Sequence, residues 1–151
     1  MENKKIDKLM ETIGLIISSH GGIIHSKTKL VKLIYLIDLI SKKKNNYKIT
    51  EATYKSYFYG PYSEDIDIAL HQLKDLELID VYEDFSLYTG RQYYTIKLKD
   101  LPNFGALSEE EKKLIRNITS RYKNKPLDEI LEEVYNTEEF SRTNFGEEIS
   151  F

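Results

Sequence analysis

The sequence contains no cysteine. This absence excludes a disulfide framework and thiolate metal sites, and it is compatible with the reducing cytosol. The first ten residues, MENKKIDKLM, lack the apolar core of a secretory signal, so we expect a cytoplasmic protein. The longest apolar stretch, LVKLIYLIDLI, is interrupted by Lys32 and Asp38 and is too short to span a bilayer. It predicts a buried helix and no membrane partner.

Motifs of catalysis are also missing. No G-x-G-x-x-G, P-loop, G-x-S-x-G or H-E-x-x-H pattern occurs, and the three histidines have no cysteine or patterned acid beside them. Ser63, Glu64, Asp65 and Asp67 follow Gly60-Pro61, where a helix-capping hydroxyl and first-turn carboxylates explain them. We therefore expect no enzyme, no cofactor and no metal.

The 151 residues, 40% hydrophobic and 31% charged, predict one soluble globular domain, placed at residues 1–140, followed by an acidic tail at 141–151. The net charge of −3 is unevenly distributed: residues 1–48 carry +6 and residues 126–151 carry −7. This asymmetry suits a charged partner or two ends that lie against each other. Solvated helix faces are the simpler alternative.

Periodicity predicts five helices and little strand. Helices are expected at 4–19, from the cap Ser26 to about Lys44, after Ser63, after the capping box Ser108-x-x-Glu111, and from Pro126 onward. The helix expected after Ser63 has an apolar stripe formed by Ile66, Leu70, Leu73 and Leu76.

The remaining patterned segments predict strands. Residues 53–59 favour a strand ended by Gly60-Pro61, and 78–83 with 93–98 favour a hairpin closed over Thr89-Gly90. The fold class is thus α+β, mostly α-helical with a small antiparallel hairpin, in a winged-helix-like arrangement.

A winged helix normally suggests DNA binding through the helix before the wing. Here that helix carries five acids against the single Lys74, with Arg91 the only base near the hairpin turn, so phosphate would be repelled. A different pose on the basic second helix stays open, and its candidate nucleic-acid contacts are Lys27, Lys29, Lys32, Lys42, Lys43 and Lys44.

Aromatic residues gather around Gly60-Pro61, in the stretch KSYFYGPYSEDI. Tyrosine supplies large contact area at low entropic cost and is enriched at interface hot spots. The rings either pack on the second helix or form a partner-binding surface, and the sequence leaves both alternatives open.

The order of these features resembles the Panacea, or SocA-like, antitoxin domain, also called GepA-like and phage-associated. The resemblance rests on Lys29, Leu30, Lys32, Leu33 and Tyr35 in KLVKLIY, then Tyr59, Gly60 and Pro61, and runs from about Thr28 to Phe140. The family often ends in a His, an acid and an aromatic residue. Here Asn136 stands in place of the His, while Glu138 and Phe140 keep the outline, so no role of that His carries over.

The resemblance implies a non-enzymatic antitoxin-like module that neutralises or regulates a partner protein, such as a cognate toxin, by direct contact. The acids would suit a basic toxin surface. A winged-helix DNA-binding regulator and a homo-oligomeric protein remain as alternatives. The expected partner-binding residues are Tyr57, Tyr59, Gly60, Pro61, Tyr62, Glu64 and Asp65.

Overall fold

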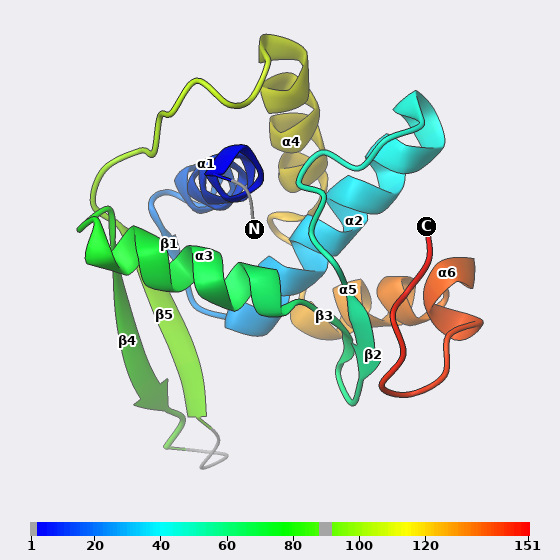
Figure 1. The fold of residues 1–151 in the computed structure, drawn as a ribbon. Coiled ribbons are helices and arrows are strands. Elements are labelled where there is room, and N and C mark those ends of the chain that lie inside the picture. Colours follow the sequence, from blue (N-terminus) through cyan, green and yellow to red (C-terminus); the bar gives the residue numbers. More distant parts are fainter. Residues whose placement is uncertain (1–2, 88–91) are drawn as a thin grey trace.

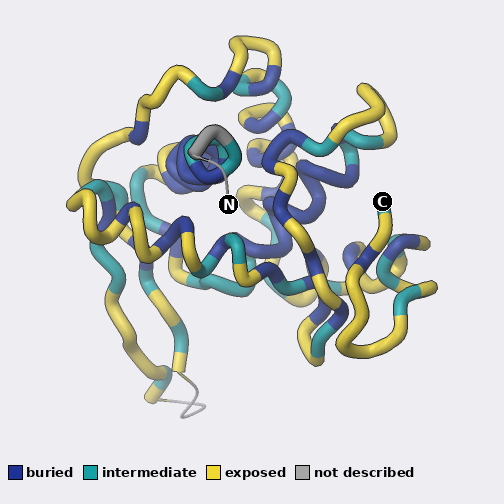
Figure 2. The backbone as a smooth tube through the Cα atoms, viewed as in Figure 1, coloured by how far each residue is buried: buried dark blue, intermediate teal, exposed yellow. Residues whose placement is uncertain are grey.

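The protein, described from a computed structural model at residues 3–87 and 92–151, is built around one helix, α2, whose residues 30–39 are buried (Figure 1). Apolar residues of α2 repeat so densely that most of its faces are covered, and it contacts α1, α4, α5, β3 and β5. Buried residues are concentrated along α1 and α2 (Figure 2). The helices are α1 (Asn3–Ser19), α2 (Lys27–Asn45), α3 (Glu64–Asp75), α4 (Glu109–Tyr122), α5 (Leu127–Tyr135) and α6 (Glu138–Ser141).

Three strands form an antiparallel sheet beside α1 and α3. The order is β1-β5-β4, with Ile23 paired to Lys97 and Ile79 paired to Leu98. The alternation of apolar and polar residues predicted the β4–β5 hairpin, but it did not predict the short β1. Thr89, Gly90 and Arg91 lie outside the described residues. The strands are β1 (Ile23–Ile24), β4 (Ile79–Phe85) and β5 (Gln92–Leu98). The mostly helical α+β class is confirmed, and the winged-helix arrangement stays a prediction.

The segment around Gly60-Pro61 differs from the expected strand at 53–59. Strand β2 (Lys55–Tyr57) turns at Phe58 and Tyr59, and Gly60-Pro61 begins the returning strand β3 (Gly60–Tyr62) rather than ending the first. The φ of Gly60 is +96°, a conformation that L side chains rarely adopt. A Cβ at position 60 would also lie 3.1 Å from Cε1 of Tyr135. Glycine at this position therefore closes the hairpin and lets it approach α5.

Side-chain caps mark the starts of α2 and α4. The hydroxyl of Ser26 accepts the amide of Lys29 at 3.0 Å, and Ser108 with Glu111 forms the expected capping box. Ser63 stands at the start of α3, but its buried hydroxyl makes no cap bond and has no partner among the described residues. Leu76, expected in the buried stripe, follows the last residue of α3 and is 53% exposed.

The C-terminal segment packs onto the β2–β3 hairpin. The Ser56 amide donates to the Glu147 carbonyl at 3.0 Å, and the Ile149 amide donates to the Tyr54 carbonyl at 2.8 Å. Ile149 is buried, and the Phe151 ring lies 5.6 Å from that of Tyr54. The division at residue 140 into a domain and a tail stays a prediction, but residues 146–151 run beside β2 and contact the core.

We predict that Gly60→Ala lowers the free energy of unfolding by about 2–3 kcal/mol, because the new Cβ combines backbone strain with a close contact. Gly105→Ala is the matched control, since Gly105 has φ +67° but nothing within 4 Å of its Cβ position. That variant should cost only about 1 kcal/mol. Urea unfolding measures both, and equal losses would contradict the packing role of Gly60.

Candidate partner-binding surface

A buried lysine holds the hairpin against α2. Lys32 is 2% exposed, and its Nζ donates to the carbonyl of Pro61 at 2.8 Å. Burial lowers the pKa of Lys32 to about 8. Its Cε would lie 3.4 Å from a Cβ at Gly60, so the lysine stem lies along the returning strand. Lys32 and the Gly60-Pro61 pair, which are separated in the sequence, are thus in direct contact.

A second buried charge on α2 fixes the segment that leads into the hairpin. The carboxylate of Asp38 is fully buried and accepts the Thr50 amide at 2.9 Å and the Tyr54 hydroxyl at 2.7 Å. Burial raises the pKa of Asp38, and these hydrogen bonds act against that rise. Tyr54 also packs edge-on against Tyr35 with ring centroids 5.4 Å apart. Residues 50–54 are therefore tied to α2 before the chain enters β2.

Four aromatic side chains form what we call the hairpin patch: Tyr57, Phe58, Tyr59 and Phe145. Phe58 is 83% exposed, Tyr59 69% and Phe145 59%, and the rings of Phe58 and Phe145 lie 4.7 Å apart. The Tyr57 ring, half-buried, lies 5.8 Å from that of Phe145. Phe145 thus contacts the rings of Tyr57 and Phe58, and Tyr59 stands exposed beside Phe58 in the same turn. Exposed aromatic side chains that cluster in this way are typical of interaction sites.

The residues expected to contact a partner divide into three groups. Tyr57, Tyr59 and Glu64 are at least partly open to solvent, whereas Gly60 and Pro61 are buried and shape the hairpin. The other two, Asp65 and Tyr62, make hydrogen bonds within the protein, so their polar groups are less available to a partner. Asp65 accepts the Thr53 amide at 2.9 Å, and Tyr62 donates to Asp67, which pairs with Lys27 at 2.5 Å.

Phe58 and Phe145 were not among the expected contacts. Phe58 could have been found, because it belongs to the aromatic stretch KSYFYGPYSEDI that the sequence singles out. Phe145 could not, because it reaches the patch only through the pairing of residues 146–149 with β2.

The basic residues of α2 do not form one open surface. Lys32 is buried, Lys27 pairs with Asp67, and Nζ of Lys29 donates to the Lys123 carbonyl at 2.8 Å. Lys42, Lys43 and Lys44 lie at the opposite end of the helix, about 25 Å away by helical rise. This placement does not favour α2 as a nucleic-acid interface.

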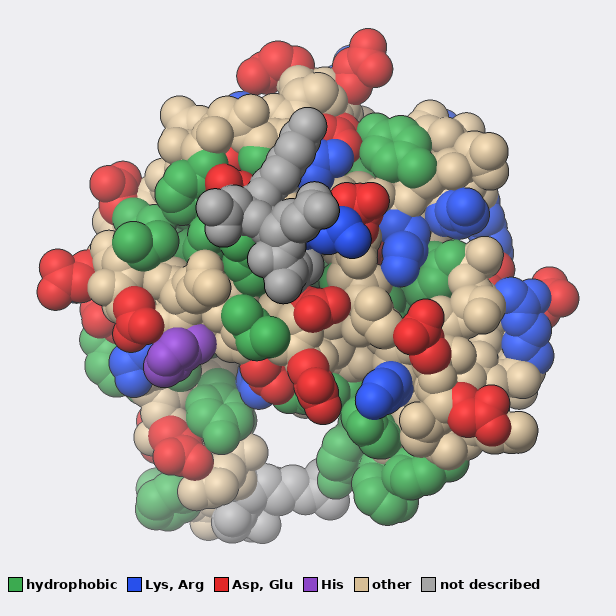
Figure 3. Space-filling view, viewed as in Figure 1, with side chains coloured by type: hydrophobic (Ala, Val, Ile, Leu, Met, Phe, Trp, Pro, Cys, Tyr) green, Lys and Arg blue, Asp and Glu red, His purple; other side chains and the backbone are tan. Residues whose placement is uncertain are grey.

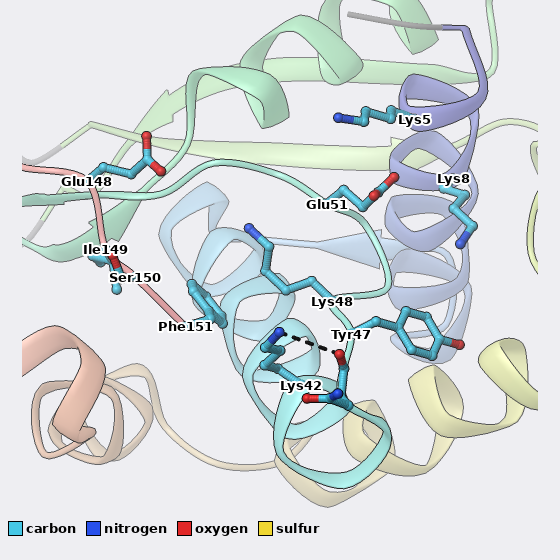
Figure 4. Close-up of a pocket in the computed structure, with 11 residues that line it drawn as sticks. Lys5, Lys8, Lys42, Tyr47, Lys48, Glu51, Glu148, Ile149, Ser150 and Phe151 are labelled. Carbon is cyan, nitrogen blue, oxygen red and sulfur yellow. Dashed lines mark hydrogen bonds between the residues drawn. The ribbon is translucent and has the colours of Figure 1, made fainter.

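A polar cavity of about 700 Å³ lies where α1, the end of α2 and the C-terminal segment meet (Figure 4). Lys5, Lys8, Lys42 and Lys48 line it together with Glu51 and Glu148. Lys8 pairs with Glu111 at 3.0 Å, and Nζ of Lys48 donates to the Ala52 carbonyl at 2.7 Å. Basic and acidic parts of the chain meet here, and the mixed charge of the lining selects no one class of ligand.

The described part of the chain has neither a metal-binding cluster nor a membrane-spanning helix. Within residues 3–87 and 92–151, no group of three or more His, Cys, Asp or Glu side chains could hold a metal ion. His20, His25 and His71 bond separately, to the Ile16 carbonyl, Thr95 and Asp75. In the same described ranges, no helix has the length and apolar character needed to cross a membrane.

Fold and surface together define a small α+β domain in which the β2–β3 hairpin, held against α2, exposes aromatic side chains. The family model described as antitoxin SocA-like, Panacea domain, matches residues 30–140, which include most of α2, the β2–β3 hairpin and α5. The chain belongs to this family, and the resemblance inferred from the sequence is confirmed. No curated protein and no solved structure matches the chain. Family membership supports an antitoxin-like role in general terms.

The buried position of Lys32 makes stability depend on pH in a specific direction. Its pKa is about 8 in the folded chain against 10.5 ordinarily, so between these values the unfolded chain binds more protons. Wild-type stability should therefore rise across this window. Methionine does not titrate, so Lys32→Met lacks this pH dependence. The free energy of unfolding of the wild type, relative to that of Lys32→Met, should therefore increase by about 2 kcal/mol from about pH 7 to about pH 9.5.

Urea unfolding at the two pH values measures this difference. Lys44→Met, at an exposed position, serves as the control and should follow the wild type. Parallel pH profiles for the wild type and Lys32→Met would show that Lys32 does not stay buried in the folded protein.

Proposed function

We propose that this protein is a non-enzymatic antitoxin-like module that binds a partner protein through the hairpin patch. The observation that carries the proposal is the contact between Phe58 and Phe145, two largely exposed rings 4.7 Å apart. Exposed apolar rings that are held rigidly lose little entropy on binding and are typical of interface hot spots. The Lys32 and Asp38 contacts supply that rigidity, because they fix both ends of the segment that presents the rings.

The surroundings of the patch favour a basic partner, such as a cognate toxin with a positively charged surface. Glu64, Glu147 and Glu148 are exposed close to the hairpin in the chain or through backbone pairing, and they outnumber the exposed Lys55 of β2. Opposite charges around an apolar centre raise the association rate and suppress wrong partners. Tyr57, Tyr59 and Glu64 are proposed as direct contacts, with Gly60, Pro61, Tyr62 and Asp65 shaping the surface.

The winged-helix arrangement is part of the same proposal. It is supported by the sheet order β1-β5-β4 and by the position of α3 directly before the β4–β5 hairpin. On α3, Glu64 and Asp75 are exposed and Asp67 is committed to Lys27, so this helix suits a protein contact better than phosphate. We therefore propose a winged-helix scaffold that serves protein recognition.

The test is co-expression with the product of the adjacent gene, scored by growth rescue and by co-purification. The wild type should rescue growth and form a complex. Phe58→Ala with Tyr59→Ala should weaken the complex by about 2–4 kcal/mol, the range of an interface hot spot, while the melting temperature stays unchanged. Isothermal titration of the purified proteins gives the affinities.

Phe104→Ala is the control, because Phe104 is also an exposed phenylalanine but lies in the loop before α4. It should bind like the wild type. The proposal fails if the wild type forms no complex and rescues no growth, or if the hairpin and control variants bind equally well. A self-associating protein with no other partner would favour the homo-oligomer instead.

A further inference from the structure

One face of α5 is apolar but uncovered. Ile130 and Val134 are buried in the core, whereas Leu127 and Leu131, one turn apart on another face, remain half-exposed. Tyr135 continues this second stripe by one more turn and reaches the hairpin near Gly60. The helix therefore has a second apolar stripe that its own fold does not bury.

Leu127 and Leu131 of this stripe line a groove of about 380 Å³. The rest of the lining comes from Tyr93 and Tyr94 of β5, from Tyr59 of the hairpin patch and from the start of α2. The space-filling view shows the molecule hollowed between the β4–β5 end and the β2–β3 hairpin, with hydrophobic side chains on both sides (Figure 3). Such a lining can take two or three apolar side chains of a ligand.

Among the described residues, the exposed charges that flank the stripe and lie next to the β5 tyrosines are acidic. Lys27 is the one cation among the described lining residues, and its ammonium pairs with Asp67 at 2.5 Å. On α5, Asp128 and Glu132 flank the stripe and are exposed. On β4, the exposed Glu83 and Asp84 pair in register with Tyr94 and Tyr93. An occupant with basic residues beside its apolar ones would find acids next to the stripe on α5 and, one strand beyond the lining of the groove, on β4.

We propose that this groove binds a basic amphipathic helix of the partner protein. Its apolar side chains would lie between Leu127, Leu131 and the tyrosines, and its Lys or Arg side chains would face the acids of α5 and β4. This inference rests on the proposed function, because the helix is taken to belong to the partner that binds the hairpin patch. The groove and the hairpin patch share Tyr59. It adds the chemical character of the segment that the partner inserts.

A model peptide tests the groove without knowledge of the partner. The probe is a fluorescein-labelled helix of about 15 residues made of Leu and Lys in amphipathic order, with a Leu and Glu peptide of the same pattern as its charge-reversed control. We expect saturable binding of the Lys peptide alone, measured by fluorescence anisotropy. Leu131→Arg should weaken it about tenfold, and Glu132→Lys several-fold.

Two variants away from the groove control for general attraction to an acidic protein. Leu76→Arg changes an exposed leucine that follows α3, and Glu110→Lys reverses an exposed charge on α4. Both should change the affinity less than twofold. Circular dichroism confirms that every variant is folded.

The groove proposal is overturned by absence of saturable binding, by equal binding of the two peptides, or by equal losses in the groove and control variants. These outcomes are separable from failure of the proposed function. If Leu131→Arg leaves the affinity for the co-expressed partner unchanged while the Phe58 and Tyr59 variant loses it, the groove proposal alone is wrong. If the partner does not bind at all but the peptide occupies the groove, the proposed function alone is wrong.

Discussion

The hydrogen bond from Lys32 to the Pro61 carbonyl is the contact on which the presented surface depends. It places a charge in the core, 2.8 Å from a backbone oxygen, on a helix whose buried residues are mostly aliphatic. A buried ammonium is costly unless its hydrogen bond is made, so the hairpin has little freedom to leave α2. The left-handed Gly60 allows the close approach that this bond requires. Asp38 provides the corresponding constraint earlier in the segment, through Thr50 and Tyr54.

Rigid support of the hairpin explains how exposed aromatic residues can be useful to a binding module. Phe58 and Tyr59 stand on a turn of two residues whose flanking strands are fixed by α2 and by the segment that carries Phe145. The chain therefore bears most of the ordering cost when it folds, and less remains when a partner binds. The uncovered stripe of α5 lies beside the same hairpin, so both apolar surfaces are held by one scaffold.

Features with local causes could be predicted from the sequence. The caps at Ser26 and Ser108, the helical spacing of α1 and α2, and the alternation of β4 and β5 each depend on neighbouring residues. The Gly60-Pro61 strand was mistaken for a turn, because its conformation is set by Lys32 and Tyr135. Phe145 enters the patch through long-range pairing, which no local pattern reveals. The two faces of α5 could not be separated, because burial of Ile130 but not Leu131 depends on what packs against each.

The most direct measurement places a photoreactive phenylalanine analogue at position 58 and, separately, at position 104, in the complex with the partner. After irradiation, the cross-linked partner is identified and quantified by mass spectrometry. The account predicts efficient cross-linking of the partner from position 58 and only background from position 104. Cross-links from position 104 but not from position 58, or cross-links from position 58 only to a second copy of this chain, would contradict it.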